Sequence, residues 1–476
     1  MAADLTHLSI RKTHEHLLAK DFSVSELTHA FIDDALQKNK DLNAYLEIYP
    51  DIREQVETAQ KKIENGNADI LTGIPLAIKD NILIKGKKAS AASKILKNYT
   101  ATYTATAAQK LLDELVVFIG RTNMDEFAMG GSTENSAFGV TKNPHDLTRV
   151  PGGSSGGSAA AVSGGMALAA LGSDTGGSIR QPASFCGCVG LKPTYGVVSR
   201  YGLMAMGSSL DVIGPITKTV EDAEIIFNVI KGHDPLDSTS LSPDMYSAKK
   251  KREKIVIGVP KEVLETPGMD ADVKVNFEQS IKKLSSLGYE VKEISLPNIK
   301  YSLASYYILM PAEVSSNLAR FDGVKYGLLK EGKDLLEDYF LTRGEGFGKE
   351  VRRRIMLGTY VLSSGYYDAY YNKASAIRRL ISRDFEKVFD VVDAIITPTA
   401  PTPAFKIGEK ANDPLSMYLA DIFTVTANIV GVPAISIPSG EVLREEKHLP
   451  LGLQLMAPHG EESVLFSVGK KFLGES

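Results

Sequence analysis

Residues 151–179 read PGGSSGGSAAAVSGGMALAALGSDTGGSI, and their composition is unlike that of the rest of the chain. Nine of these 29 residues are glycine, against 41 of 476 overall, and Asp174 is the single charged residue. Glycine at this density lets the backbone approach a ligand closely and turns several N–H groups toward one point. The stretch therefore predicts a buried site lined by backbone. Residues 158–171 within it predict a helix of small side chains packed against strands.

Three known motifs match this stretch only in part. A P-loop needs Gly-Lys-Ser/Thr to hold the terminal phosphates, and the absence of lysine between residues 143 and 191 disfavours nucleotide binding by this loop. Residues 152–156 fit the G-x-S-x-G of α/β-hydrolases, but of the later histidines only His459 could serve as the base and nothing singles it out. Asp174 begins a DTG triplet, yet an aspartic protease needs a second aspartate to share the proton.

The remaining chemistry is a serine nucleophile served by a lysine. Lys79 is the only charge in LTGIPLAIK, which predicts a buried strand, so desolvation would lower its pKa and make a neutral amine available as a base. Ser154 lies in the glycine loop, and Ser178 ends DTGGS, where consecutive amides could form an oxyanion hole. The same residues also fit helix caps and turns, with Lys79 paired to Asp80. Spacing alone does not separate the two interpretations.

Strands and helices alternate along the rest of the chain. Ser23 and Glu26 form a capping-box pattern ahead of an amphipathic helix, and a strand is expected at residues 116–120. After a polar, exposed connector at residues 233–253, a strand (KIVIGVP), a helix over residues 270–287 and a strand (YEVKEISL) are predicted. VVDAIITP and AISIPSG predict further strands. This alternation predicts an α/β fold with a mixed sheet.

Composition and charge exclude several classes of protein. With 54 Lys and Arg against 58 Asp and Glu, the net charge of −4 disfavours a dominant nucleic-acid or anionic-membrane binder. Cys186 and Cys188 can neither staple a chain of this length nor complete a four-ligand zinc site, which favours the reduced cytoplasm. The first residues lack the apolar core of a secretory signal, and the glycine and serine of residues 151–173 suit a lipid-facing helix poorly. No membrane contact is expected.

Taken together, these motifs resemble those of the amidase signature family. The signature is PGGSSGGSAAAVSGGMALAALGSDTGGSIRQPASFCGCVGLKPTYGVVS, preceded at a distance by GIPLAIKDN. The resemblance implies the amidase signature fold, a central mixed β-sheet covered by helices on both sides. It assigns Ser178 as the nucleophile, Ser154 as a bridging serine after a cis peptide bond, and Lys79 as the base. It assigns the oxyanion hole to the backbone amides of Thr175, Gly176, Gly177 and Ser178.

Four further stretches resemble the family members that hydrolyse glutamine for a tRNA-dependent amidotransferase. They are RTNMDEFAMGGSTENSAFG, ASYYILMPAEVSSNLARFDGVKYG, GEGFGKEVRRRIMLGTYVLSSGYYDAYY and MYLADIFTVTANIVGVPAISIPSG. Glutamine presents an α-carboxylate and an α-ammonium, so its pocket needs an arginine and a carboxylate. The resemblance assigns these to Arg354 and Asp421. It also implies a hydroxyl from Tyr306 or Tyr307 and leaves that choice open.

The chain departs from this pattern at two positions and at its end. Gly131, near the expected pocket wall, stands where a serine is usual, and Thr426 stands where a proline is usual. The carboxy-terminal end is short, which bears on a partner contact. None of these departures touches the predicted triad.

The resemblance implies a glutaminase subunit that delivers ammonia for the conversion of Glu-tRNA(Gln), Asp-tRNA(Asn) or both. It implies no cofactor in this chain. ATP and magnesium, with most of the contact to misacylated tRNA, would belong to a B subunit, and a small C subunit would complete a heterotrimer. A free-standing amidase acting on small aliphatic or aryl amides is the alternative, since it shares the triad but needs neither Arg354 nor Asp421. A silent scaffold is disfavoured by the intact triad.

The resemblance extends over nearly the whole chain, which is expected to form a single large domain, residues 1–476. Within it, residues 1–65 are expected to form N-terminal helices and residues 66–232 the signature core with the triad. Residues 233–253 would connect this core to a second lobe, residues 254–476, that supplies the glutamine pocket.

Overall fold

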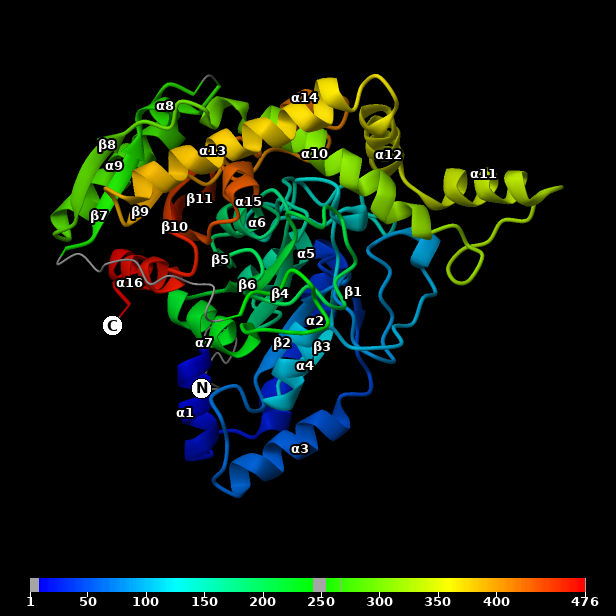
Figure 1. Cartoon of the computed structure of the whole chain (residues 1–476). Coiled ribbons are helices and arrows are strands. Elements are labelled where there is room, and N and C mark those ends of the chain that lie inside the picture. Colours follow the sequence, from blue (N-terminus) through cyan, green and yellow to red (C-terminus); the bar gives the residue numbers. More distant parts are fainter. Residues whose placement is uncertain (1–7, 243–253, 267, 476) are drawn as a thin grey trace.

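A mixed β-sheet runs through the whole molecule. The structure, a computed structural model, describes residues 8–242, 254–266 and 268–475. Within them an eleven-stranded sheet has the order β1-β3-β2-β4-β6-β5-β10-β11-β9-β7-β8 (Figure 1). The strands are β1 Tyr45–Ile48, β2 Pro75–Lys79, β3 Val117–Thr122, β4 Ala169–Asp174, β5 Val189–Lys192, β6 Val212–Thr217, β7 Val256–Pro260, β8 Glu290–Ile294, β9 Ala394–Pro398, β10 Ala434–Arg444 and β11 Lys447–Met456. Pairs β2–β3, β2–β4, β7–β8 and β7–β9 are parallel and the other neighbouring pairs are antiparallel, which confirms the predicted mixed sheet.

Helices flank this sheet, so the predicted α/β fold is confirmed (Figure 1). The α-helices of the described residues are α1 Ile10–Ala19, α2 Val24–Leu42, α3 Arg53–Glu64, α4 Thr106–Asp113, α5 Gly156–Ser163, α6 Arg180–Phe185, α7 Val220–Ile230, α8 Lys261–Leu264, α9 Ala271–Ser286, α10 Ser302–Asn317, α11 Leu335–Gly346, α12 Lys349–Leu362, α13 Lys373–Phe389, α14 Pro414–Leu419, α15 Val425–Val430 and α16 Glu462–Leu473. Figure 1 shows α11 on a projection that leads away from the body of the molecule.

Most elements predicted from the sequence form close to their expected positions. α2 begins after Ser23, whose side chain and Glu26 form the predicted capping box. Residues 116–120 overlap β3, and β7, α9 and β8 form the predicted strand–helix–strand unit with the two strands parallel. The two late strands are β9 and β10.

The prediction of one helix over residues 158–171 is wrong in its limits. α5 ends at Ser163, and β4 already begins at Ala169. Gly165 between them has a φ of +70°, a conformation that favours glycine and ends a helix. The small side chains of α5 are buried, as predicted, and allow it to lie against β4 and β2.

The first part of the predicted connector packs onto the core instead of lying exposed. Asp234 and Asp237 are buried, and Asp237 accepts a hydrogen bond from the amide of Arg200 at 2.8 Å. Carboxylates held in this way tie the segment to the preceding loop. The prediction of an exposed connector over residues 233–253 is therefore wrong for its first part, and residues 243–253 lie outside the described residues.

The sheet joins the two halves of the chain and brings the signature motifs to one edge. β10, from the second half, pairs antiparallel with β5, with Ala434 opposite Lys192. β2 and β4 are parallel neighbours, so Lys79 at the end of β2 and Asp174 at the end of β4 emerge at the same edge. Ligands of α/β folds bind at such carboxyl ends of strands.

The described residues contain no membrane-spanning helix and no metal-binding cluster, and both of their cysteines are buried. Among residues 8–242, 254–266 and 268–475, no helix combines the length and the apolar character needed to cross a bilayer. In that same part of the chain no group of three or more His, Cys, Asp or Glu side chains is arranged to hold a metal ion. Cys186 and Cys188 are buried and free, and burial raises the pKa of Cys188 to about 12, so this thiol is unreactive at neutral pH.

Thr426, in α15, leaves a buried hydroxyl unpaired within the described residues. Its side chain is fully buried in α15, and Oγ1 has no hydrogen-bond partner in the described part of the structure. Because an unsatisfied buried hydroxyl costs about 1–3 kcal/mol, we expect Thr426→Val to raise the free energy of unfolding by about 1 kcal/mol. Chemical denaturation measures this change.

Thr424→Val is the matched control for this prediction. Thr424 Oγ1 donates a hydrogen bond to the Gly176 carbonyl at 2.7 Å, so the same change removes a satisfied bond. The free energy of unfolding should then fall by about 1 kcal/mol. A loss of stability in Thr426→Val equal to that in Thr424→Val would show that the hydroxyl at 426 is satisfied.

Candidate active site at the ends of β2 and β4

Lys79 ends inside a cluster of serine side chains. It is fully buried, and its Nζ lies 2.8 Å from Ser154 Oγ, 2.8 Å from Ser155 Oγ and 2.9 Å from Ser173 Oγ. Ser155 donates its own proton to the Ser173 carbonyl at 3.1 Å, so its oxygen accepts from the lysine. A neutral amine that donates to Ser155 and Ser173 keeps its lone pair for the Ser154 hydroxyl.

Burial sets the protonation of this lysine. Desolvation lowers the pKa of Lys79 to about 7, although Asp125, Asp174 and Asp211 raise it part of the way back. None of these three carboxylates makes an ion pair with Nζ in the described structure. A substantial fraction of the amine is therefore neutral at pH 7 and able to act as a base.

The alternative interpretation, in which Lys79 pairs with Asp80, is wrong. Asp80 Oδ1 lies 2.7 Å from Arg121 Nη1, and the same carboxylate accepts hydrogen bonds from the amides of Ser90 (3.1 Å) and Ala92 (2.8 Å). Asp80 thus turns away from the serine cluster. Its charge is compensated by Arg121, so among the described residues the lysine has no direct counter-ion.

Ser154 is presented to the lysine by a fixed turn. The Gly153–Ser154 peptide bond is cis, as the resemblance implied. Beneath the turn, buried Asp125 accepts hydrogen bonds from the amides of Ser132 (3.2 Å) and Thr133 (2.9 Å). A side chain at Gly153 would collide with this carboxylate, so glycine is required there. The amide of Asp125 donates to the Ser154 carbonyl at 3.2 Å, which ties the turn to the carboxylate below it.

Asp174 organises the loop that carries Ser178. Its carboxylate accepts hydrogen bonds from the amides of Gly177 (2.9 Å) and Ile179 (3.1 Å) and lies 2.9 Å from Arg180 Nη2. Burial alone would raise its pKa, but the Arg180 guanidinium holds the pKa of Asp174 well below the usual range. The ionised carboxylate therefore keeps the loop in one shape at neutral pH.

Among the described residues, three amides of this loop have no protein acceptor. The Gly177 amide donates to Asp174, so the prediction that all four amides face the oxyanion fails at this residue. Within the described structure the N–H groups of Thr175, Gly176 and Ser178 donate to no acceptor, although these residues are buried. Unpaired buried N–H groups beside a serine hydroxyl are what an oxyanion hole needs. An oxyanion hole of these three amides remains a prediction.

Ser178 lies against the Ser154 turn through its backbone. Its carbonyl accepts a hydrogen bond from the amide of Ser155 at 3.1 Å, and the residue is 7% exposed. Within the described structure no hydrogen bond joins the Ser178 and Ser154 hydroxyls. Catalytic hydrogen bonds often form fully only with substrate bound. The structure thus joins Lys79 to Ser154 directly and places Ser178 beside them.

The residues predicted to bind glutamine also lie together. Arg354, on α12, is 3% exposed, and its guanidinium carbon lies 5.6 Å from the ring centres of both Tyr307 and Tyr418. Its Nε donates to Glu350 at 2.8 Å. On the other side, Tyr307 donates its hydroxyl proton to Asp421 Oδ2 at 3.0 Å. A cation and a carboxylate therefore flank one tyrosine.

The carboxylate of this pocket is poised to meet a cation. Burial raises the pKa of Asp421 to about 7, although the Tyr307 hydroxyl lowers it part of the way back. A ligand ammonium beside the carboxylate would favour its ionised form. Gly131 lies on the same wall, because a Cβ built there would be 3.8 Å from Asp421 Oδ1. A Cβ at position 131 would thus lie in ordinary van der Waals contact with Asp421 and would not collide with it.

Two contacts join this pocket to the oxyanion loop. Thr424 Oγ1, which bonds to the Gly176 carbonyl, also donates to the carbonyl of Asp421 at 3.1 Å. The ring of Tyr306 lies so close to Gly176 that a Cβ there would be 2.6 Å from Tyr306 Cζ. Tyr306 therefore borders the loop and Tyr307 borders Asp421. The choice between Tyr306 and Tyr307 as the residue that contacts glutamine stays open.

The sequence interpretation missed Ser155 and Ser173, which surround the lysine. Ser155 directly follows the predicted Ser154, and Ser173 stands two residues before Thr175, the first residue of the predicted oxyanion hole. A fully desolvated amine needs several oxygen partners, because buried polar groups are almost always hydrogen-bonded. Serines within a stretch predicted to be buried were the available signal for these partners.

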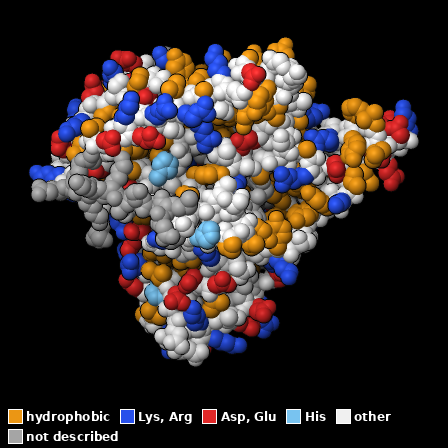
Figure 2. All heavy atoms as spheres, in the orientation of Figure 1, with side chains coloured by type: hydrophobic (Ala, Val, Ile, Leu, Met, Phe, Trp, Pro, Cys, Tyr) orange, Lys and Arg blue, Asp and Glu red, His pale blue; other side chains and the backbone are white. Residues whose placement is uncertain are grey.

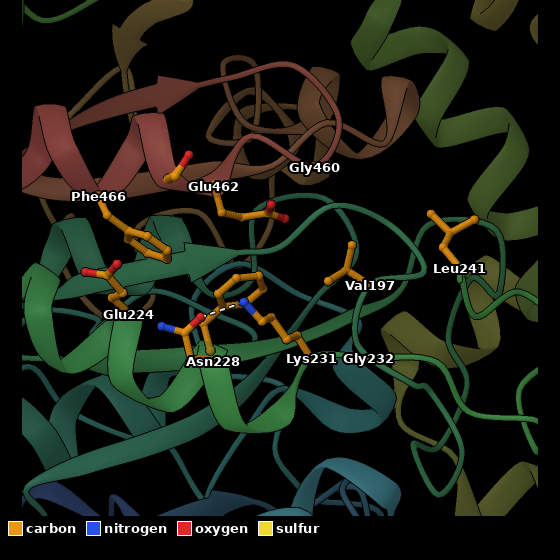
Figure 3. Close-up of a pocket in the computed structure, with 11 residues that line it drawn as sticks. Val197, Glu224, Asn228, Lys231, Gly232, Leu241, Gly460, Glu462 and Phe466 are labelled. Atoms are coloured by element: carbon orange, nitrogen blue, oxygen red, sulfur yellow. Dashed lines mark hydrogen bonds between the residues drawn. The ribbon is translucent and has the colours of Figure 1, made fainter. Parts of the chain in front are cut away.

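A second hollow lies apart from this cluster. It has a volume of about 340 Å³ and lies between α7 and α16, with Lys231 and Phe466 among its lining residues (Figure 3). Lys231 Nζ donates to Asn228 Oδ1 at 2.7 Å across its floor. None of the lining residues belongs to the serine–lysine cluster or to the Arg354 pocket. The hollow is therefore separate from the candidate active site.

Comparison with known proteins agrees with the site. Residues 26–466 match the family model described as Amidase. The A subunit of glutamyl-tRNA(Gln) amidotransferase from Thermodesulfovibrio yellowstonii is 57% identical over 447 residues, 92% of each chain. The protein of the same name from Thermoanaerobacter pseudethanolicus is 54% identical over 475 residues, which are 98% of this chain and 96% of the other.

Solved structures give the same result. A crystal structure of the A subunit of glutamyl-tRNA(Gln) amidotransferase from Thermotoga maritima is 44% identical and has a TM-score of 0.79, covering 99% of this chain and 94% of that one. Native peptide amidase from Stenotrophomonas maltophilia is 26% identical with a TM-score of 0.81, covering 98% of this chain and 96% of that one. Because the family model spans most of the sequence and the relatives match along nearly their whole length, this chain belongs to the amidase family.

Proposed function

We propose that this chain is the glutaminase subunit of a tRNA-dependent amidotransferase. It hydrolyses glutamine and delivers ammonia to a partner subunit that converts Glu-tRNA(Gln), Asp-tRNA(Asn) or both to the amidated product. The observation that carries the proposal is the buried contact of Lys79 with Ser154, beside Ser178, together with the cluster in which Arg354 and Asp421 both contact Tyr307. The relatives named as the A subunit of glutamyl-tRNA(Gln) amidotransferase support it.

The serine–lysine cluster can transfer the γ-glutamyl group of glutamine to Ser178. Ser178 Oγ attacks the side-chain amide carbon of glutamine, while its proton passes to Ser154 and the Ser154 proton passes to neutral Lys79. The amides of Thr175, Gly176 and the nucleophile itself hold the charge that develops on the oxygen. Each such donor is typically worth about 2.7–4 kcal/mol in the transition state.

Breakdown of the tetrahedral intermediate releases ammonia. The protonated Lys79 returns its proton through Ser154 to the leaving nitrogen, so the C–N bond breaks and a γ-glutamyl ester remains on Ser178. Water, deprotonated through the same relay, then attacks the ester and releases glutamate. A relay of two hydroxyls suits a lysine that is fully buried behind Ser154.

No cofactor is assigned to this chain. ATP, magnesium and the misacylated tRNA would be handled mainly by a B subunit, and a small C subunit would join the two chains in a cytoplasmic heterotrimer. Because the relatives are named as one lettered subunit of an amidotransferase, those proteins work in a complex of several subunits. The identity of the B and C subunits, and their contacts with tRNA, belong to the proposal.

The glutamine pocket distinguishes this function from a free-standing amidase of small amides. We expect Arg354→Gln to raise the KM for glutamine about 100-fold, because losing a buried hydrogen bond between charged groups costs about 1.5–3 kcal/mol. Hydrolysis of propionamide, which has no α-carboxylate, should change less than about threefold. Steady-state kinetics of the chain with its partner subunits measure both values.

Arg353→Gln is the matched control, since this neighbouring arginine also contacts Glu350 but its side chain is 44% exposed. It should leave the KM for glutamine within about twofold of the wild-type value. Equal losses on glutamine and propionamide in Arg354→Gln would mean that Arg354 supports the fold alone, and the free-standing amidase would then be the better interpretation.

A further inference from the structure

α12 separates the glutamine pocket from an exposed apolar surface. Its inner face is buried and holds Arg354 in the pocket. Its outer face presents Met356, Leu357 and Tyr360, which are 72%, 43% and 46% exposed. Large apolar side chains grouped in this way on a surface mark interaction sites. One face of α12 is thus buried and carries Arg354, whereas the other face is exposed and apolar.

Three tyrosines extend this outer face beyond the end of α12. The ring centre of Tyr360 lies 4.3 Å from that of Tyr366 and 6.2 Å from that of Tyr370. Tyr366, Tyr367 and Tyr370 are 41%, 41% and 39% exposed. Together the residues form one surface, the aromatic face, made of Met356, Leu357, Tyr360, Tyr366, Tyr367 and Tyr370. Tyrosine and methionine are among the residues enriched at the centres of protein interfaces.

Close packing couples the aromatic face to the pocket. A Cβ at Gly358 would collide with the Pro311 carbonyl, so α12 lies directly against α10 at this point. α10 also carries Tyr306 and Tyr307, the tyrosines that border the oxyanion loop and Asp421. The helix that carries the aromatic face therefore packs directly against the helix that carries Tyr306 and Tyr307.

The charges around the aromatic face indicate which kind of partner can bind there. Between residues 349 and 379 one exposed side chain is acidic, Asp368, whereas the exposed basic side chains are Lys349, Arg352, Arg353, Lys373 and Arg379. A second copy of this chain docked about a two-fold axis would bring these like charges together. The face instead fits a different protein with an apolar centre and a rim of carboxylates.

We propose that the aromatic face is the docking surface for the partner subunit that consumes ammonia. This inference rests on the proposed function. Ammonia released into water would be protonated and lose its nucleophilic lone pair, so the accepting subunit must seal against the surface next to the pocket. The aromatic face meets this need, because the helix that carries it also forms the pocket wall through Arg354.

A second exposed apolar group offers a matched comparison. Figure 2 shows hydrophobic side chains gathered on the projection that carries α11, where Leu335, Leu336 and Phe340 are 61%, 64% and 70% exposed. This projection leads away from the body of the molecule (Figure 1). It contributes none of the residues assigned above to the glutamine pocket.

The test compares two double variants of equal chemistry. Met356→Glu with Tyr360→Glu should weaken the Kd for the B and C subunits of the same organism at least about 30-fold, as expected when interface hot spots are lost. Leu336→Glu with Phe340→Glu, on α11, should change that Kd less than about threefold. Binding is measured by biolayer interferometry with the purified BC pair, and thermal unfolding verifies that each variant is folded. If the α12 double variant is unfolded, the single change Met356→Glu replaces it.

The outcomes separate the surface from the function. If wild-type chain and BC form no complex that uses glutamine, the proposed function fails. If the wild-type complex works and the α12 variants bind as tightly as wild type, only the docking surface is wrong. A loss confined to the α11 variant would place the interface there. A loss of tRNA binding with unchanged BC binding in the α12 variants would assign the aromatic face to RNA instead.

Discussion

We expect Ser178→Ala to abolish the use of glutamine by the assembled complex while leaving ammonium salts effective. The change removes the oxygen that attacks the amide, and no other hydroxyl in the cluster takes its place, because those of Ser154, Ser155 and Ser173 lie around the lysine. Loss of a serine nucleophile from such a relay costs about 10⁴-fold or more in kcat. Formation of amidated tRNA with glutamine or with ammonium chloride, at equal partner concentration, measures both arms.

Two features make this a test of mechanism and not only of stability. An alanine fits wherever the serine does, and Ser178 makes its structural contact through its carbonyl, which accepts the Ser155 amide. The ammonium-dependent rate reports whether the complex is assembled. If both nitrogen sources fail to the same extent, the proposed division between a glutaminase and an ammonia-consuming partner is wrong. If glutamine still works, Ser178 is not the nucleophile.

The sequence was sufficient to predict the fold class, and the residues predicted for the site come together at the ends of β2 and β4. The glycine-rich stretch and the apolar segment ending at Lys79 predicted buried elements, but a base and an ion pair with Asp80 both remained open until the family resemblance favoured the base. β2 and β4 are parallel neighbours, so their ends meet. The limits of α5 were not predictable from composition, because the residues that follow it include types typical of helices and types typical of strands. The turn at Gly165 depends on the positive φ of that residue.

Details of hydrogen bonding within the site could not be predicted. The DTGGS motif places four amides in sequence, but the side chain of Asp174 accepts from one of them, Gly177, and this depends on the fold of the loop. The buried aspartates at 234 and 237 lie in a segment whose polar composition predicts a solvated loop unless its partners are known. Pairing of Asp237 with Arg200 is a tertiary contact without a local signal.

The burial of Arg354 likewise depends on packing and not on a local motif. Arg354 sits among three consecutive arginines, and nothing in RRR distinguishes the one that is buried. The helix does so, because α12 turns Arg354 toward α10 and leaves Arg352 and Arg353 exposed. The same orientation of α12 leaves Met356, Leu357 and Tyr360 of the aromatic face exposed. A family resemblance could name the residue, but only the packing of α12 explains why that residue and not its neighbours enters the pocket.

We expect Lys79→Met to reduce the glutamine-dependent rate about 10³-fold, because general-base catalysis contributes about 10²–10⁴-fold. Methionine keeps the length and fills the buried site without an amine, so Ser154 loses its proton acceptor. In the wild-type protein the neutral amine is the active form, and burial lowers its pKa to about 7. The wild-type rate should therefore fall tenfold per unit as pH drops below about 7, and the residual rate of the variant should lack this fall.

Lys192→Met is the matched control for this change. Lys192 is also fully buried, and desolvation likewise lowers its pKa to about 7, but its Nζ donates to the Pro193 carbonyl at 2.8 Å and touches no serine of the cluster. Its replacement should leave the rate within about tenfold and keep the fall below pH 7. If both methionine variants lose activity equally, or if Lys79→Met retains the wild-type pH profile, a buried cation rather than a base is what the site requires. The distinction matters because burial alone gives both lysines the same pKa, and only the contact with Ser154 makes one of them useful as a base.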